Sequence, residues 1–298
     1  MIIKKERFFE LFNNIVFWSD KSDLIEKIAK YPWRYVWLFR PTKPKTKIFQ
    51  NLSQSHEIRF WDALEEVIEE IAINKWYQVL QKHNLSYNWE IIDIDQLFFS
   101  KDGKNLYMVE QKVRDDHDST KKRWQIDNFE KKLNYVTDTY WTQYENIFCI
   151  MYFIDPSLDK NKNFYEDEIS RMKQIYWNKL LLLYWQDFFN LLFGEWTWNE
   201  LENLLKERRD LLPDFPIVDY DDNVEESLWI MVNLNFSIIR KFIMNEELWT
   251  EWIMKVLFKN WDTLKELSKY HISMYKYNNE EKFLNLWQYL QWKIALYF

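Results

Sequence analysis

Two acidic residues and a lysine are spaced so that a strand–turn–strand segment could bring their side chains together. Asp95 lies in the β-rich segment 91–99, and Glu110 and Lys112 end the next apolar run. Because side chains alternate between the two faces of a strand, Glu110 and Lys112 share one face, and so do Asp93 and Asp95. Two carboxylates and an ammonium group that converge at strand ends would suit a divalent metal ion and a nucleophilic water.

The residues between Asp95 and Glu110 predict a tight hairpin. Lys101-Asp102-Gly103-Lys104 supplies the turn, and apolar, β-rich residues lie on both sides of it. The alternative is an exposed hairpin edge with ordinary charges, since charged residues are common. The acids nevertheless interrupt strongly apolar strands, where an unpaired carboxylate is costly to bury. We therefore expect Asp95 and Glu110 to meet at neighbouring strand ends.

A helix predicted over residues 55–72 offers a further carboxylate. Its apolar residues recur at helical spacing and form one stripe, which consists of Phe60, Leu64, Val67, Ile68 and Ile71. Glu65 lies at the edge of this stripe, from which it could reach the acidic pair. The alternative is that Glu65 belongs, with the neighbouring glutamates, to a solvated acidic face.

The loop after Lys112, residues 113–123, is densely polar and basic at its end. Its candidates for phosphate contacts are Arg114, Lys121, Lys122 and Arg123. His117 is a candidate general base because histidine titrates near neutral pH, although a surface position or a DNA contact is the simpler interpretation. A helix predicted over 125–136 follows, and Gln125 lies near its N-terminus, where its amide and the helix dipole could serve an anion.

Strands and helices alternate through the first two thirds of the chain. A helical start over residues 1–38 precedes the segments described above, and the later predictions are a strand over 145–154, a helix over 165–176, a strand over 180–184 and a helix over 186–193. This alternation predicts an α/β fold in which a mixed central β-sheet is flanked by helices.

A proline-rich segment, Leu212-Pro213-Asp214-Phe215-Pro216, marks a boundary in the sequence. Beyond it the chain is predicted to be helical to its end. We predict two domains: residues 1–205 form an α/β domain with a helical N-terminal part, and residues 206–298 form a helical region.

The overall composition excludes several protein classes. The 298 residues carry a formal net charge of −7, so any surface for nucleic acid must be local. Cys149 is the single cysteine, which excludes an internal disulfide framework and fits a reducing cytoplasm. No apolar run approaches the roughly 18 residues of a membrane span, and the start of the chain lacks a signal-peptide pattern. We expect a soluble, cytoplasmic protein with no membrane partner.

The tryptophan and glycine counts are abnormal. The chain has 18 Trp and 2 Gly, whereas glycine usually makes up about 7% of a protein and is needed at turns and helix ends. Tryptophan stands where glycine is expected at Trp89, Trp124 and Trp185. We hypothesise that many of these positions are UGA codons, which the source organism reads as glycine. An AT-rich genome with genuine tryptophans is the alternative, but that bias does not predict abundant Trp.

The segment from Asp95 through Glu110-Gln111-Lys112 and the loop 113–123 resembles a type II restriction endonuclease of the PD-(D/E)xK superfamily. The loop is most similar to the HinfI or TdeIII group. The similarity continues, less specifically, through residues 152–157, 212–216 and 245–247. The resemblance implies a PD-(D/E)xK nuclease core with helical additions at both ends of the chain. It also implies that the helical region 206–298 serves DNA recognition, dimerisation or both. It also implies glycine at Trp124.

The resemblance further implies roles for individual residues. Asp95 and Glu110 would be Mg²⁺ ligands, with Asp93 as the rival for the first position. Lys112 would orient the attacking water or help to deprotonate it, and Glu65 would be an accessory acid. The implied substrate is double-stranded DNA, read at a short specific site by a homodimer, because a symmetric site calls for two-fold symmetry. The implied functional companion is a cognate DNA methyltransferase.

Two other functions remain open from the sequence. The first is a repair or recombination nuclease with the same core, although no helicase or ATPase motif is visible. The second is an inactive relative that binds DNA without cutting it. Retention of Asp95, Glu110 and Lys112 together argues against the second, because loss of activity should release at least one of them.

Overall fold

The computed structural model describes residues 2–17, 19–36, 42–112, 119–155, 160–177, 179–212, 218–250 and 253–297. The chain divides into two compact units. The sheet unit consists of Met1–Phe12 and Trp61–Leu212, and the helical unit consists of Asn13–Phe60 and Pro213–Phe298. Helix α4 (Pro44–Asn74) belongs to both, because its first half lies in the helical unit and its second half in the sheet unit.

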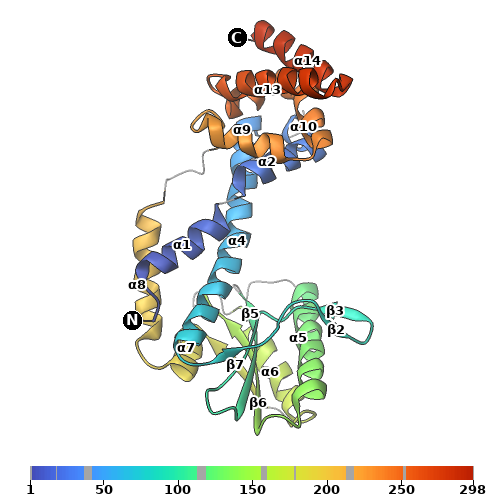
Figure 1. The fold of residues 1–298 in the computed structure, drawn as a ribbon. Coiled ribbons are helices and arrows are strands. Elements are labelled where there is room, and N and C mark those ends of the chain that lie inside the picture. Colours follow the sequence, from blue (N-terminus) through green and yellow to red (C-terminus); the bar gives the residue numbers. More distant parts are fainter. Residues whose placement is uncertain are drawn as a thin grey trace. The chain divides into compact units, whose positions relative to one another are not determined.

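A five-stranded mixed sheet forms the centre of the sheet unit, with strand order β1-β4-β5-β6-β7 (Figure 1). The strands are β1 (Gln78–Val79), β4 (Gln96–Phe99), β5 (Asn105–Lys112), β6 (Asn146–Phe153) and β7 (Lys179–Tyr184). β4 pairs antiparallel with β1 and β5, whereas β5, β6 and β7 are parallel. The prediction of a mixed central sheet flanked by helices is confirmed.

Helices α5 (Ser119–Tyr140) and α6 (Lys162–Lys173) cover one face of this sheet. They connect β5 to β6 and β6 to β7, as parallel neighbours require. The predicted inner stripe of α5 is buried, with Ile126, Phe129, Leu133 and Val136 each at most 3% exposed. These side chains share a core with Leu106, Met108 and Cys149 of the strands and with Tyr165 and Ile169 of α6.

Aromatic side chains line the opposite face of the sheet. Tyr152 of β6 stacks on Phe188 of α7 (Gln186–Phe193) with ring centroids 4.2 Å apart. Tyr77 meets the rings of Phe98 and Phe193 edge-on. The other helices of this unit are the first turns of α1 (Lys5–Val16), the second half of α4 and α8 (Thr197–Asp210), which was not predicted.

The predicted strand over 91–99 is interrupted. β3 (Glu90–Ile92) pairs with β2 (Leu85–Tyr87) in a separate two-stranded sheet, and β4 begins only at Gln96. Residues 93–95 therefore connect two sheets, and the strand alternation that would place Asp93 beside Asp95 does not hold there. The predicted turn is present, because Gly103 N–H donates to Ser100 O at 2.8 Å.

The helical unit has its own hydrophobic core. Residues of α2 such as Leu24, Ile25 and Ile28 are buried with the C-terminal helices. Residues 13–60 thus pack with residues 213–298, whereas the sequence-based division grouped them with the sheet. The helices are α2 (Asp20–Lys30), α3 (Trp33–Val36), α9 (Val224–Asn233), α10 (Phe236–Ile243), α11 (Glu246–Thr250), α12 (Ile253–Leu257), α13 (Asp262–Asn278) and α14 (Glu281–Tyr297).

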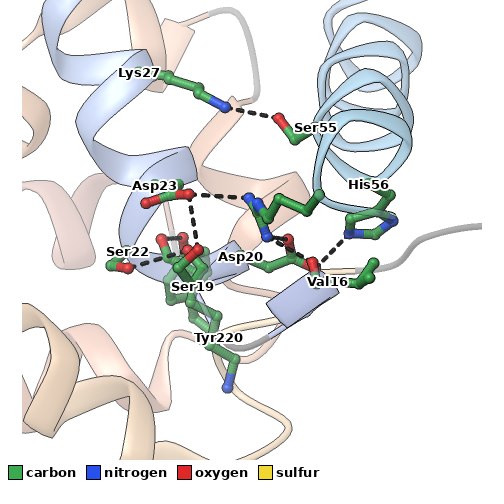
Figure 2. Close-up of polar contacts among 11 residues, drawn as sticks. Val16, Ser19, Asp20, Ser22, Asp23, Lys27, Ser55, His56 and Tyr220 are labelled. Carbon is green, nitrogen blue, oxygen red and sulfur yellow. Dashed lines mark hydrogen bonds and ion pairs between the residues drawn. The ribbon is translucent and has the colours of Figure 1, made fainter. Parts of the chain in front are cut away.

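A cluster of ion pairs fixes the start of α2 to the first half of α4 (Figure 2). Arg59 donates to Asp20 at 2.8 Å, to Asp23 at 2.9 Å and to the carbonyl of Val16 at 2.6 Å. His56 Nε2 lies 2.6 Å from the second oxygen of Asp20. Both aspartates stand in the first turn of α2, where the helix dipole also favours negative charge. This cluster therefore joins α2 to α4 within residues 13–60 of the helical unit.

Tryptophan occupies several backbone positions that suit glycine. Among the described residues, eight that are not glycine have a positive φ, and five of the eight are tryptophans. The five are Trp76, Trp89, Trp185, Trp196 and Trp261, with φ between 49° and 74°. The other three are asparagines, which tolerate this conformation better than bulky residues do.

Candidate active site

Asp95 and Glu110 meet where β4 begins and β5 ends. The strands pair so that Gln96 lies opposite Val109, which places Asp95 beside Glu110. The backbone N–H of Gln111 donates to Asp95 Oδ2 at 2.7 Å and fixes that carboxylate against β5. Glu110 is 1% exposed. The hairpin thus brings the two carboxylates together at the site that the sequence predicts.

Lys112 reaches both carboxylates from the same strand. Its Nζ lies 2.5 Å from Glu110 Oε1 and 3.6 Å from Asp95 Oδ2. Glu110 and Lys112 share one face of β5, as strand alternation requires. The register continues across the sheet, with Lys112 opposite Phe153 and Phe153 opposite Tyr184. The site therefore lies at the edge formed by the carboxyl ends of three parallel strands.

A second lysine, which the sequence reasoning missed, enters the site from α5. Lys132 Nζ contacts Glu110 Oε2 and lies 3.6 Å from Asp95 Oδ1. Lys132 is 5% exposed. A signal for it exists, because Lys132 follows Phe129 by three residues and precedes Val136 by four, so it falls within the buried stripe of the helix. Asn128, one turn earlier, donates weakly to Glu110 Oε1 at 3.5 Å.

Burial and the two lysines act in opposite directions on the pKa values of the two acids. Burial by itself would raise the pKa of Glu110, but the ammonium groups of Lys112 and Lys132 outweigh burial and lower this pKa below its ordinary value. Asp95 has a raised pKa, because it is buried and lies next to the charged Glu110. Burial opposes the charge on Lys112, yet the adjacent carboxylates raise its pKa. The site is therefore a compact cluster of compensated charges.

Glu65 of α4 is electrostatically part of this cluster. Burial and the charge of Asp95 raise the pKa of Glu65 to about 8. Its helix is tied to β4, since the side-chain amide of Gln96 donates to the backbone carbonyl of Glu65 at 2.7 Å. The structure thus places Glu65 near the acidic pair rather than on a fully solvated face.

Asp93 lies away from the pair. Its carboxylate accepts a hydrogen bond from Asn84 N–H at 2.8 Å and lies 3.6 Å from His83 Nδ1, and its side chain is 62% exposed. It belongs to the connection between the two sheets. Asp95 is therefore the acid that the structure places beside Glu110, and the pairing of Asp93 with Asp95 on one face is corrected.

The predicted DNA-contacting residues are placed in different environments. Arg114 and His117 lie outside the described residues. Lys121 and Arg123 are exposed at the start of α5, and the half-buried Lys122 donates to Asn161 at 3.2 Å and lies over the ring of Phe164. Gln125 is 6% exposed and accepts from Tyr165 Oη at 2.5 Å, so in this conformation it offers almost no surface to a phosphate.

The donor atoms of the site suit a hard cation such as Mg²⁺, which is commonly held by one or two carboxylates and several waters. Asp95 and Glu110 supply two carboxylates. In the described part of the chain, no group of three or more His, Cys, Asp or Glu side chains is arranged to hold a metal ion. The described residues therefore offer a cation two carboxylates rather than a full protein cage.

Comparison with known proteins identifies the segment that carries the site. Residues 72–208 match the family described as "Type II restriction endonuclease, HinfI". No curated protein and no solved structure matches the chain. None of the described helices is both long and apolar enough to cross a membrane. The matched segment contains Asp95, Glu110, Lys112 and Lys132, so the acidic pair and both lysines lie in the part of the chain that is similar to type II restriction endonucleases of the HinfI family.

Proposed function

We propose that the protein is a Mg²⁺-dependent type II restriction endonuclease that hydrolyses phosphodiester bonds at a short specific site in double-stranded DNA. The observation that supports this proposal most strongly is the convergence of Asp95, Glu110 and Lys112 in a segment of the HinfI family. The family implies a DNA-cleaving hydrolase. Metal dependence, site specificity and the roles of individual residues are the proposed parts.

Asp95 and Glu110 are the proposed ligands of the ion. Bound there, Mg²⁺ would lower the pKa of a water and offset the negative charge that develops at phosphorus. The ammonium group of Lys112 would orient the attacking water and add positive charge beside the pentavalent phosphate. Glu65 would act as an accessory acid whose proton state responds to the same cluster.

The exposed cations at the start of α5 are the proposed phosphate contacts. In the sequence, Lys121 and Arg123 come nine and eleven positions after Lys112, the last residue of β5, so the chain carries these cations shortly after the acidic pair. Phosphate contacts position an enzyme on DNA but do not read the sequence. Base recognition and a homodimer interface are therefore proposed for other parts of the protein, with the helical unit as the candidate.

The biological setting follows from the proposed reaction. An enzyme that cuts a short sequence would also cut the DNA of its own cell, so we propose that a cognate DNA methyltransferase protects the host sites. We also propose a cytoplasmic location, because the proposed substrate is intracellular DNA.

Digestion of unmethylated plasmid DNA tests this function. The protein, with glycine wherever the gene carries a recoded codon, should yield discrete fragments with Mg²⁺ and none with EDTA. Glu110→Ala should yield none under either condition. A smear would favour the repair or recombination nuclease. Folded protein that leaves several DNAs intact with Mg²⁺ would contradict the enzyme and favour the DNA-binding relative.

A further inference from the structure

The four carboxylate oxygens of Asp95 and Glu110 are divided between two ammonium groups. Lys112 faces Glu110 Oε1 and Asp95 Oδ2. Lys132 faces Glu110 Oε2 and Asp95 Oδ1. Each lysine therefore bridges both acids. If all four groups are ionised, the two positive charges equal the two negative charges of the pair.

The burial of Lys132 makes this pairing obligatory in the metal-free protein. Lys132 is 5% exposed and comes from the helix that covers the sheet. A buried ammonium group without a partner is strongly destabilising, and so is an uncompensated buried carboxylate. A divalent cation that bridged Asp95 and Glu110 would need oxygen atoms that Lys132 now contacts. The lysine and the cation therefore compete for the same negative charge.

We propose that Lys132 is a built-in cation that neutralises the Asp95–Glu110 pair in the metal-free protein and gives way when a divalent cation binds. This inference rests on the proposed function, since it assumes that the acidic pair holds the ion. The four-carbon side chain of Lys132 allows its ammonium group to move without movement of the helix. Lys132 would then stabilise the metal-free fold and, by the same contacts, weaken the affinity for the cation.

Calorimetric titration with Mg²⁺ and with Ca²⁺, together with thermal unfolding, tests the role of Lys132. Lys132→Met should bind Mg²⁺ about tenfold more tightly, because it removes a positive charge within a few ångströms of the ion. Without metal, the variant should also melt at a lower temperature than the wild type. Added Mg²⁺ should raise its melting temperature by more than it raises that of the wild type. Lys131→Met is the matched control, because the neighbouring Lys131 pairs with Glu90 outside the acidic pair.

The outcomes separate this inference from the proposed function. Wild-type protein that binds neither ion would contradict both. Wild-type binding together with equal or weaker affinity in Lys132→Met would contradict only the role of Lys132. If the methionine variant does not fold, Lys132→Gln is titrated in its place, since glutamine is neutral and can still donate a hydrogen bond to Glu110. The same tenfold gain is expected there, and its absence would overturn the inference.

A second inference comes from the backbone at the end of α4. Tyr77 N–H donates to Ala72 O at 3.0 Å, and Trp76 N–H donates to Ile73 O at 2.9 Å. This pair of bonds is the Schellman motif, in which the residue that follows the helix has a left-handed conformation and is usually glycine. Trp76 occupies that position with φ of 70°. A tryptophan therefore stands at a site whose hydrogen bonding favours glycine.

Trp89 and Trp196 show the same mismatch. Their φ values are 68° and 74°. The side chain of Trp89 is fully exposed, and those of Trp76 and Trp196 are 69% and 72% exposed. A bulky residue in this conformation is a backbone outlier, and an exposed indole buries little apolar surface that could offset the strain. Trp261 differs, because it is 4% exposed and stacks on Trp249.

We infer that positions 76, 89 and 196 are glycine in the protein that the source organism makes, through UGA codons read there as glycine. Reading the codons tests this directly, since UGA is expected at all three and UGG at the three would overturn it. The triple variant Trp76→Gly/Trp89→Gly/Trp196→Gly should melt at a higher temperature than the protein with tryptophan. Trp229→Gly, inside α9, should melt at a lower temperature because glycine disfavours a helix interior. A triple variant no more stable than the parent would also contradict the inference.

Discussion

The side chains of Lys132 and Glu110 meet in the interior although they are 22 positions apart in the chain. Glu110 belongs to β5 and Lys132 to the helix that follows, so the β5–α5 connection brings an ammonium group over the end of the strand. The ammonium group of Lys112 contacts the other oxygen of the Glu110 carboxylate. Glu110 is thus held between two lysines.

Removal of the Glu110 charge should therefore affect both activity and stability. Glu110→Gln should reduce DNA cleavage by at least about 10²-fold, which is the scale for loss of one electrostatic group in an active site. It should also lower the free energy of unfolding by roughly 3 kcal/mol, because it leaves one carboxylate for two ammonium groups, of which that of Lys132 is buried. Cleavage assays and urea unfolding measure the two effects.

The control for Glu110→Gln is Glu145→Gln, which removes an exposed carboxylate paired with Lys104. A surface ion pair contributes about 1 kcal/mol or less, so this variant should cleave DNA and unfold like the wild type. A fully active Glu110→Gln protein would show that Glu110 is not part of the catalytic machinery.

The raised pKa of Glu65 predicts that the stability of the folded protein decreases as the pH rises. Its pKa is about 8 in the folded metal-free protein and near its ordinary value of 4.5 when unfolded. Between these values the unfolded chain loses the proton first, so stability decreases as the pH rises from about 4.5 to 8. Glu65→Gln should abolish this loss. The free energy of unfolding of the variant relative to the wild type should therefore be roughly 1–3 kcal/mol higher at pH 8 than at pH 4.5. Unfolding titrations across this range, without metal, measure it.

Glu66→Gln is the matched control for Glu65→Gln, because Glu66 is exposed on the same turn of α4. Its pH dependence should equal that of the wild type. If Glu65→Gln and Glu66→Gln have the same stability profile, Glu65 does not hold a proton near neutral pH in the folded protein.

His271 predicts the opposite dependence in the helical unit. Its side chain is 3% exposed, neither ring nitrogen has a hydrogen-bond partner among the described residues, and burial lowers its pKa to about 4. The unfolded chain takes up the proton near pH 6.5, so the stability present above that pH is lost as the pH falls toward 4. The loss should be on the order of 2–3 kcal/mol.

His271→Leu should remove most of that acid sensitivity, whatever it does to stability at neutral pH. His83→Leu, which alters a side chain that is 56% exposed, should retain it. Thermal or urea unfolding of both variants between pH 4 and pH 7.5 provides the comparison. An unchanged slope in His271→Leu would mean that another group causes acid unfolding.

The central hairpin could be predicted because its physics is local. Apolar β-rich runs on both sides of a Gly-containing turn specify β4 and β5, and the alternation along β5 sets Glu110 and Lys112 on one face. The parallel strands β6 and β7 and the helices between them were likewise visible as separate runs. The continuous strand over 91–99 was wrong because residues 93–95 connect two sheets, a break that alternation alone does not reveal.

Other features depend on distant contacts and could not be predicted. Leu24, Ile25 and Ile28 of α2 share a buried core with the C-terminal helices, so residues 13–60 group with those helices rather than with the sheet. Lys132 appears in the sequence as one of several lysines on a charged helix. Its position within the apolar stripe is the one feature of the sequence that predicts its burial. Its contact with Glu110 is visible only in the folded structure.

End-sequencing of the fragments from a digested bacterial genome, with Mg²⁺, tests the proposed endonuclease most directly. We predict that the fragment ends map to one short sequence, that the same sites are protected after methylation by the cognate methyltransferase, and that Glu110→Gln produces no such ends. Ends distributed without a common sequence, or equal numbers of ends from wild-type protein and Glu110→Gln, would contradict a site-specific endonuclease that acts through this acidic pair.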